Sequence, residues 1–176
     1  LRPLTGMPGL IDAHTHITFY WDKMPGTNPW KAWERISPAA IVYLAQESAL
    51  KTLETGVTSI RDLGSWAGMD LSMRDLINRV AMIGPRLFVS GNGLHVSLKA
   101  PEPGATELDP GRADNLPEVM KVVRQEIASG VDWIKIYGST GSDQDVSGFQ
   151  TYTYEEMKAA VDIAHKAGKR VAVHSY

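Results

Sequence analysis

Two histidines stand one residue apart near the start of the chain, in the run PGLIDAHTH at residues 8–16. Side chains two residues apart on a β-strand point to the same face, so Asp12, His14 and His16 are expected to share one side of a strand. Neutral imidazoles are strong ligands for zinc and similar ions. The chain has no cysteine, so any metal here would be held by nitrogen and oxygen. A pair of this kind alone is weak evidence, because alternating histidines on a strand are often a satisfied polar pair.

Two further polar residues lie in later apolar runs. Lys135 stands inside WIKIY at residues 133–137, and His174 stands near the end of VAVHS at residues 171–175. Burial lowers the pKa of a lysine and leaves the amine largely neutral, and a neutral amine can react with carbon dioxide to form a carbamate. A carboxylated Lys135 would be a two-oxygen anion able to bridge two metal ions, an arrangement suited to hydrolysis. The plainer interpretations are a lysine that extends to solvent and a histidine that caps backbone groups.

The elements that must position these residues alternate between strand and helix. The expected strands cover residues 9–17, 57–63, 86–91, 131–138 and 170–176, and the expected helices cover residues 37–56, 70–83, 119–130 and 153–168. In the second helix, Leu76, Ile77 and Val80 are expected to face inward, and Thr153 with Glu156 predicts a capping box at the start of the last helix. This alternation indicates an α/β fold of parallel strands joined by right-handed crossovers, and the length predicts one domain over residues 1–176.

Five parallel strands can be arranged in two ways. They can form an open doubly wound sheet in the order 2-1-3-4-5, or the first five strands of a TIM-type (β/α)8 barrel in sequential order. A complete barrel typically takes about 250 residues, so the barrel interpretation implies a truncated one with open edges on its first and fifth strands. Both folds place their active sites at the carboxyl ends of the strands. His14, His16, Lys135 and His174 are therefore expected at one end of the sheet.

Several runs resemble the amidohydrolase superfamily, in the branch of Xaa-Pro dipeptidases and imidazolonepropionase-like enzymes. They are PGLIDAHTHI, GVTSIRDLGS, GPRLFVSGNGLH, GVDWIKIYGSTG and AHKAGKRVAVHSY. The resemblance extends from Met7 to Tyr176 in the family's order, and it identifies the chain as the N-terminal part of such a protein. The sixth-strand histidine and the eighth-strand aspartate of the family have no counterpart in this sequence.

The resemblance implies a binuclear metal centre, with two zinc ions or with manganese or cobalt. His14 and His16 would hold the first metal, Lys135 carboxylated by carbon dioxide would bridge, and His174 would hold the second. Lys135 and His174 would thus be catalytic. The implied reaction is attack of a metal-bound hydroxide on an amide-type C–N bond of a dipeptide, an Xaa-Pro substrate or a cyclic amide.

Other residues are expected around this centre. His95 on the third βα loop and Tyr137 after the fourth strand are candidate substrate-binding residues. Asp12 and Arg61 are candidates to hold the metal ligands in position without binding the metal themselves. The first βα loop is dense in aromatic side chains: Phe19, Tyr20, Trp21, Trp30 and Trp33. These rings either pack over the barrel rim or form an apolar wall for the substrate.

Composition limits the partners. The net charge is −2, with acids and bases interspersed, which argues against nucleic acid and against an anionic membrane surface. A small-molecule or dipeptide substrate is expected, together with the missing barrel half or a second copy as a protein partner. Without a signal-peptide pattern or a membrane-length apolar run, the expected location is the cytoplasm, and secretion stays open. Two other functions also stay open, an inactive fragment that needs a complementary half and a doubly wound binding module.

Overall fold

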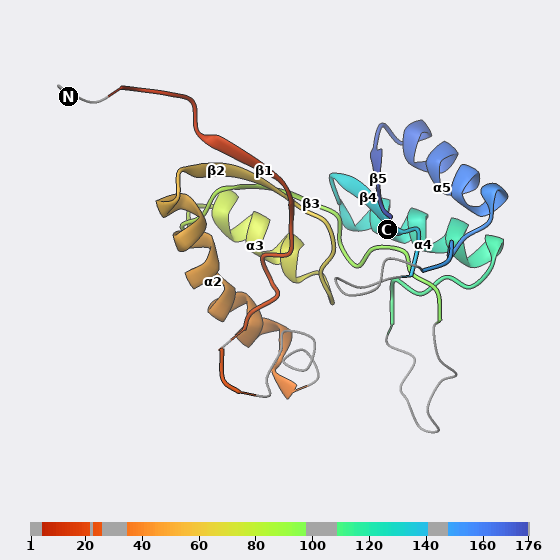
Figure 1. Ribbon diagram of the computed structural model, residues 1–176, viewed down its shortest axis with the longest axis horizontal. Helices are drawn as coiled ribbons and strands as arrows, with labels where there is room; N and C mark the ends of the chain where they lie inside the picture. The colour runs from red at the N-terminus through yellow and green to blue at the C-terminus, as the bar shows by residue number, and fades with distance from the viewer. Residues whose placement is uncertain (1–4, 22, 26–34, 98–108, 141–147, 176) are drawn as a thin grey trace.

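The computed structural model describes residues 5–21, 23–25, 35–97, 109–140 and 148–175 (Figure 1). Within these ranges strands and helices alternate along the chain. The elements are β1 (Leu10–Thr15), α2 (Pro38–Glu54), β2 (Val57–Asp62), α3 (Met69–Asn78), β3 (Arg86–Val89), α4 (Leu116–Ser129), β4 (Trp133–Tyr137), α5 (Tyr154–Lys166) and β5 (Arg170–His174). The predicted α/β alternation is confirmed.

All the paired strands run parallel and follow the order of the sequence. β1 pairs with β2 and β2 with β3, and β4 pairs with β5. The two groups are joined through the backbone, because the amide of Asp132 donates to Val89 O at 2.8 Å and the amide of Leu94 donates to Lys135 O at 2.8 Å. The sequential order is that of a barrel segment. The doubly wound alternative, in which β1 would lie between β2 and β3, is wrong.

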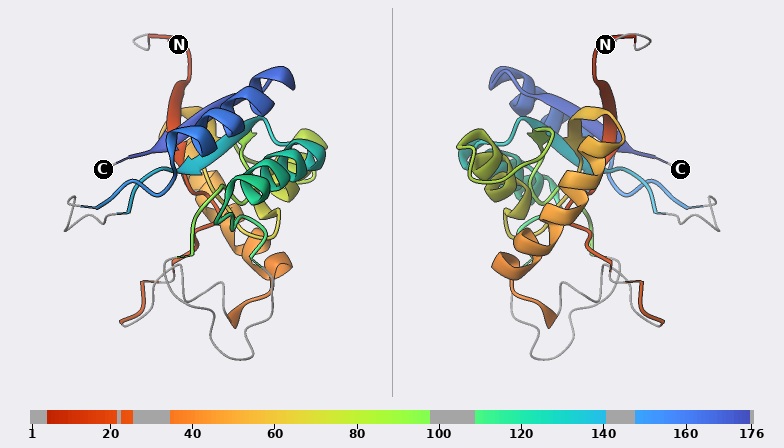
Figure 2. Two further views of the ribbon diagram at one scale, coloured as in Figure 1. Left: turned by 90° about the vertical axis from the view of Figure 1, so that its right-hand side faces the viewer. Right: turned by 90° about the vertical axis from the view of Figure 1, so that its left-hand side faces the viewer.

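The helices cover one face of the strands and bury the apolar core there (Figures 1 and 2). Ile60 on β2 and Val89 on β3 are fully buried beneath α2 and α3, and Ile134 on β4 is fully buried beneath α4 and α5. Because side chains alternate along a strand, the neighbouring residues face the other way. Phe88 on that opposite face is 40% exposed, and the same face carries the polar residues considered below.

The helix ends follow local capping chemistry. Asn115 accepts a hydrogen bond from the amide of Glu118 at 3.1 Å at the start of α4. At the start of α5, Thr153 and Glu156 form the reciprocal capping box that the sequence predicts. No helix in the described ranges combines the length and apolarity needed to cross a membrane.

The second predicted helix is shorter than expected. α3 ends at Asn78 rather than at residue 83, and Val80, expected to face inward, has a φ of 60° and is 88% exposed. The amides of Ala81 and Met82 both donate to Leu76 O, so the chain reverses direction after one left-handed residue. Met82 then enters the core, where it is 8% exposed, and takes the position that helical spacing would have given to Val80.

Candidate functional site

Three histidines from the two ends of the chain lie together beside the carboxyl ends of the strands. His14 is the penultimate residue of β1, His16 follows that strand directly, and His174 is the last residue of β5. The ring centroids of His14 and His16 are 5.3 Å apart, and those of His14 and His174 are 5.8 Å apart. The structure therefore brings these predicted ligands to one place.

Lys135 lies in the middle of β4 and faces the same group. Its side chain is 1% exposed, and its Nζ has no hydrogen-bond partner within the described residues. The amine lies 5.0 Å from the centroid of the Tyr137 ring. Burial, with a smaller contribution from the positive charge of Arg61, lowers the pKa of Lys135 from 10.5 to about 8.

Burial favours the uncharged forms of His14 and His16. Burial and the positive charge of Lys135 lower the pKa of His14 from 6.5 to about 4. The pKa of His16 is also lowered, chiefly by burial, against a raising effect of its hydrogen bond with the Gly64 carbonyl. Neutral imidazoles carry a free lone pair on one nitrogen, which is the form that binds metals.

These donors fit a metal centre only if Lys135 takes part. In the part of the chain that the structure describes, no group of three or more His, Asp or Glu side chains is arranged to hold a metal ion. A buried amine without a hydrogen-bond partner is unfavourable in a core. Its lowered pKa of about 8 increases the share of the neutral amine that reacts with carbon dioxide, but the ammonium still predominates at pH 7, so the expectation of a largely neutral amine is not met. The unpartnered Nζ of Lys135 among neutral imidazoles is thus the feature that fits a carboxylated, metal-bridging lysine.

The two residues predicted to support the ligands contact the backbone of β1. Arg61 donates from Nε to Ala13 O at 2.6 Å, and its guanidinium lies 4.5 Å from the centroid of the Trp133 ring. Asp12 accepts from the amide of His14 at 3.1 Å. Both contacts act on the strand and not on the imidazole rings, so a supporting role stays a prediction.

His95 and Tyr137 lie next to the histidine group. The ring of Tyr137 is 6.3 Å from that of His174 and 6.4 Å from that of His95. Burial, together with the charges of Asp62 and Asp70, raises the pKa of Tyr137 to about 12, so the hydroxyl remains a donor. The structure thus places both candidate substrate-binding residues along one side of the site.

His95 has an acidic partner that the sequence did not reveal. Its Nε2 lies 2.8 Å from Asp109 Oδ2. Burial alone would lower the pKa of His95, but the hydrogen bond and charge of Asp109 outweigh it, and the pKa is raised. Asp109 lies within a long loop rich in proline and glycine, where no periodicity indicates which side chain turns back toward the site.

This pair predicts a specific pH dependence of stability. Because the pKa of His95 is higher in the folded chain than its ordinary 6.5, the pair stabilises the fold fully below that pH, and the contribution is lost as pH rises through the raised value. We expect Asp109→Asn to remove this part of the dependence. Urea unfolding of both proteins between pH 5.5 and 8.5 measures it, and parallel pH profiles would contradict the pairing.

Of the aromatic loop, Phe19 reaches the candidate site. Its ring stacks on His16 with centroids 4.6 Å apart and an interplanar angle of 28°. Trp21 is 51% exposed. Trp30 and Trp33 lie outside the described residues. An apolar surface next to one ligand is therefore present, whereas its extent as a substrate wall stays a prediction.

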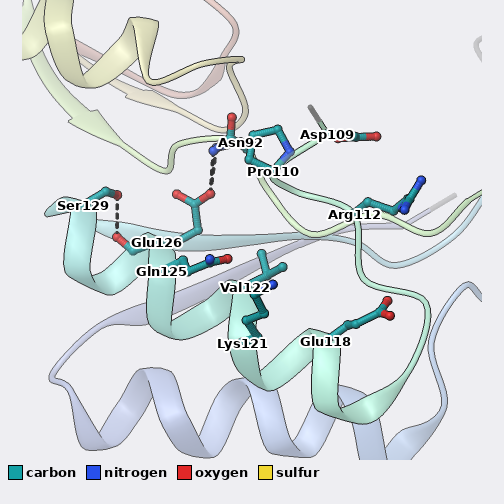
Figure 3. A pocket seen from close by; sticks show the side chains of 10 residues that line it. All are labelled: Asn92, Asp109, Pro110, Arg112, Glu118, Lys121, Val122, Gln125, Glu126 and Ser129. Atoms are coloured by element: carbon teal, nitrogen blue, oxygen red, sulfur yellow. Dashed lines mark hydrogen bonds between the residues drawn. The ribbon is translucent and has the colours of Figure 1, made fainter. Parts of the chain in front are cut away.

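A separate cavity of about 590 Å³ lies along α4 and contains none of the predicted site residues (Figure 3). Its polar groups are largely engaged with one another or with close neighbours. Glu126 accepts from Asn92 Nδ2 at 2.8 Å, and Asp109 pairs with His95. The lowered histidine pKa values and the unpartnered lysine lie elsewhere, so we assign the candidate site to the histidine group.

Comparisons with known proteins bear on the family and the fold of the chain. Residues 5–176 match the Amidohydrolase family. The chain belongs to the amidohydrolase family, as the resemblance of its sequence runs implies. No curated protein matches the chain.

Solved structures extend the comparison. The chain is 30% identical to a Xaa-Pro dipeptidase with bound methionine in the active site, with a TM-score of 0.77 over 96% of this chain and 43% of that one. It is 26% identical to an ochratoxinase from A. niger, with a TM-score of 0.78 over 97% of this chain and 43% of that one. It is 27% identical to a prolidase complexed with N-methylphosphonate-L-proline, with a TM-score of 0.78 over 97% and 43%. The chain thus spans less than half the length of these structures, and the five strands and four helices of its described residues correspond to part of their barrels.

Proposed function

We propose that this chain carries the first ligands of a metal-dependent hydrolase that cleaves an amide-type C–N bond, with Xaa-Pro dipeptides as the leading substrate class. The observation that carries the proposal is Lys135, a fully buried amine without a hydrogen-bond partner in the described residues, next to three histidines. The similarity to a Xaa-Pro dipeptidase and a prolidase supports the choice of substrate.

In this proposal each ligand has a distinct position. His14 and His16 would hold one metal ion, Lys135 would contribute as a carbamate, and His174 would contribute its imidazole to a second ion. Divalent ions of this kind, with zinc, manganese and cobalt as candidates, supply Lewis acidity and lower the pKa of water. The chain itself contributes imidazoles whose pKa values are lowered by burial and by the charge of Lys135, which favours their neutral form. It also excludes water from the lysine.

The neighbouring residues match a substrate with a carbonyl and a free carboxylate. The Tyr137 hydroxyl stays protonated and can donate to either group. His95 is kept cationic to higher pH by Asp109, but its Nε2 contacts Asp109 and its Nδ1 contacts Gly93 O, so it would attract a dipeptide carboxylate by charge and not by a direct hydrogen bond. Phe19 adds an apolar surface beside His16.

Metal binding and turnover test the proposal together. We expect the purified chain, supplied with zinc and bicarbonate, to bind metal, to gain the mass of one carbon dioxide and to hydrolyse Xaa-Pro dipeptides in a chelator-sensitive manner. Metal binding without hydrolysis would support the metal site and contradict the assignment of Xaa-Pro dipeptides as substrates. Failure to bind zinc, manganese or cobalt would overturn the metal site itself.

A second candidate is a chain that becomes active only when a complementary polypeptide covers its strand edges. The exposed apolar side chains of Ile11 on β1, at 74%, and Val173 on β5, at 50%, favour it, because such edges invite pairing. The partner would be the remaining part of a barrel or a second copy of this chain. Sedimentation of the chain with and without zinc distinguishes self-association from a monomer awaiting another polypeptide.

A further inference from the structure

One buried carboxylate contacts the residues on both sides of His16, through the Thr15 hydroxyl and the Ile17 amide. Asp62, the last residue of β2, has an exposed fraction of 0%. Its Oδ1 accepts a hydrogen bond from the amide of Ile17 at 2.6 Å and another from the Thr15 hydroxyl at 3.1 Å. β1 and β2 lie side by side (Figure 1), so this contact joins the two strand ends immediately beside the histidine.

The turn that follows Asp62 contacts the imidazole itself. The carbonyl oxygen of Gly64 lies 3.0 Å from His16 Nδ1. A carbonyl oxygen can only accept, so Nδ1 must carry the proton in this contact. The neutral ring therefore has its lone pair on Nε2, the nitrogen that is left for a ligand.

The turn leaves little room for another arrangement. Gly64 has a φ of +133°, and a Cβ added there would lie 2.2 Å from the Tyr137 hydroxyl. The amide of Leu63 donates to Thr15 O at 2.9 Å, and the hydroxyls of Thr18 and Ser65 lie 2.9 Å apart. The carbonyl of Gly64 is thus fixed relative to the end of β1, provided that the two segments stay joined.

We propose that Asp62 is a positioning residue for His16: by holding Thr15 and Ile17 it keeps the imidazole against the Gly64 carbonyl, which selects the Nδ1–H tautomer and directs Nε2 to a ligand. The nature of that ligand, a divalent metal, rests on the proposed function. The selection of the tautomer does not. Contacts of this outer kind commonly change metal affinity by about 10- to 100-fold.

A matched control lies at the next strand junction. Asp70 also has an exposed fraction of 0%. Its carboxylate accepts from the backbone amides of Leu71 at 2.9 Å, Ser90 at 3.2 Å and Gly91 at 2.8 Å. These contacts tie α3 to the end of β3 and none of them involves β1. Loss of Asp70 should therefore destabilise the fold without moving His16.

The test compares Asp62→Ala, Asp62→Asn and Asp70→Ala in the full chain by two readouts. Long-range ¹H–¹⁵N NMR of the metal-free proteins reports the tautomer of His16, and calorimetric titration reports zinc affinity. We expect the wild type and Asp70→Ala to show the Nδ1–H tautomer, and Asp62→Ala to show a mixture and to lose zinc affinity by about 10- to 100-fold. Asp62→Asn keeps an oxygen acceptor and should restore both.

An unchanged His16 tautomer in Asp62→Ala, or an equal change in Asp70→Ala, would overturn the inference. If Asp62→Ala does not fold, Thr15→Val removes only the hydroxyl that Asp62 holds, and an unaltered tautomer there would count against the inference in the same way. If the tautomer results hold but the wild type binds no zinc, the proposed metal function fails while the role of Asp62 stands.

Discussion

Replacing Lys135 by methionine is expected to stabilise the metal-free chain while abolishing its ability to take up carbon dioxide. The side chain is 1% exposed and its Nζ has no hydrogen-bond partner in the described residues, and methionine fills a similar volume without the amine. A pKa lowered from 10.5 to about 8 corresponds to a penalty of about 3 kcal/mol for the charged form. After relaxation of the site we expect a gain on the order of 2 kcal/mol at pH 7.

The lowered pKa of Lys135 also makes the stability of the wild type depend on pH. The folded chain releases the Lys135 proton at about pH 8, whereas the unfolded chain releases it near 10.5. The wild type should therefore gain stability as pH rises from 8 toward 10.5, and Lys135→Met should lack that rise. Chemical unfolding at pH 7 and pH 10 measures both terms.

The control for this experiment is an exposed lysine. Lys158 on α5 pairs with Asp162, and its side chain is 54% exposed, so Lys158→Met should change stability little at either pH. A Lys135→Met variant that is less stable than the wild type at pH 7 would show that the buried amine has a favourable interaction. A mass gain of one carbon dioxide in that variant would show that another amine is carboxylated.

Most of the fold could be predicted because its signals are local. Apolar spacing, the capping box at Thr153 and the glycines after helices depend on neighbours in the sequence, and they recovered the alternation of elements. The order of the strands could not be predicted from local sequence signals. It required the pairing of β2 with β3, which excludes the doubly wound sheet.

The candidate site also combines features that the sequence predicts with features that it does not. His14, His16, Lys135 and His174 could be placed together from the rule that parallel strands end on one side, and the structure gathers them, although their roles as ligands stay predictions. The contacts that orient the side chains of the site could not be predicted. Gly64 acts through a backbone carbonyl, and Asp109 is 14 residues from His95 in the sequence, so neither leaves a periodic signal in the sequence.

Val80 shows that helical spacing alone does not identify which residue is buried. Its spacing from Leu76 and Ile77 is that of a helical face, but the helix ends at Asn78. A single left-handed residue then brings Met82 into the core instead. The prediction that Val80 faces inward is therefore wrong, and Met82, which was not predicted, is buried instead.

Substituting alanine for both His14 and His16 is expected to abolish metal binding by the chain. The two imidazoles are the pair assigned to the first metal ion, and their ring centroids are 5.3 Å apart. Both are neutral near pH 7 because burial and Lys135 lower their pKa values, so each contributes a lone pair without first losing a proton. Zinc titration of the double variant, followed by metal analysis after dialysis, measures the loss.

Stability separates this effect from unfolding. His14 lies on the exposed side of β1, and its ring belongs to neither hydrophobic core, so its loss alone should leave the metal-free fold largely intact. The His16 ring also contacts Phe19 and Gly64, and we expect the double variant to melt only modestly lower than the wild type without metal. In the presence of zinc the difference should widen, because a metal that binds only the folded state stabilises it by an amount that grows with the logarithm of the free metal concentration relative to Kd.

The matched control is His165→Ala, which removes an exposed imidazole from the last turn of α5, on a different element from the candidate ligands. This variant should bind zinc as the wild type does. If the His14 and His16 double variant retains metal while His165→Ala loses it, the metal is held on the helical surface and the strand-end site is not the metal centre. If both retain it, the donors gathered around Lys135 serve another purpose, and the Lys135 amine itself becomes the reactive group to test.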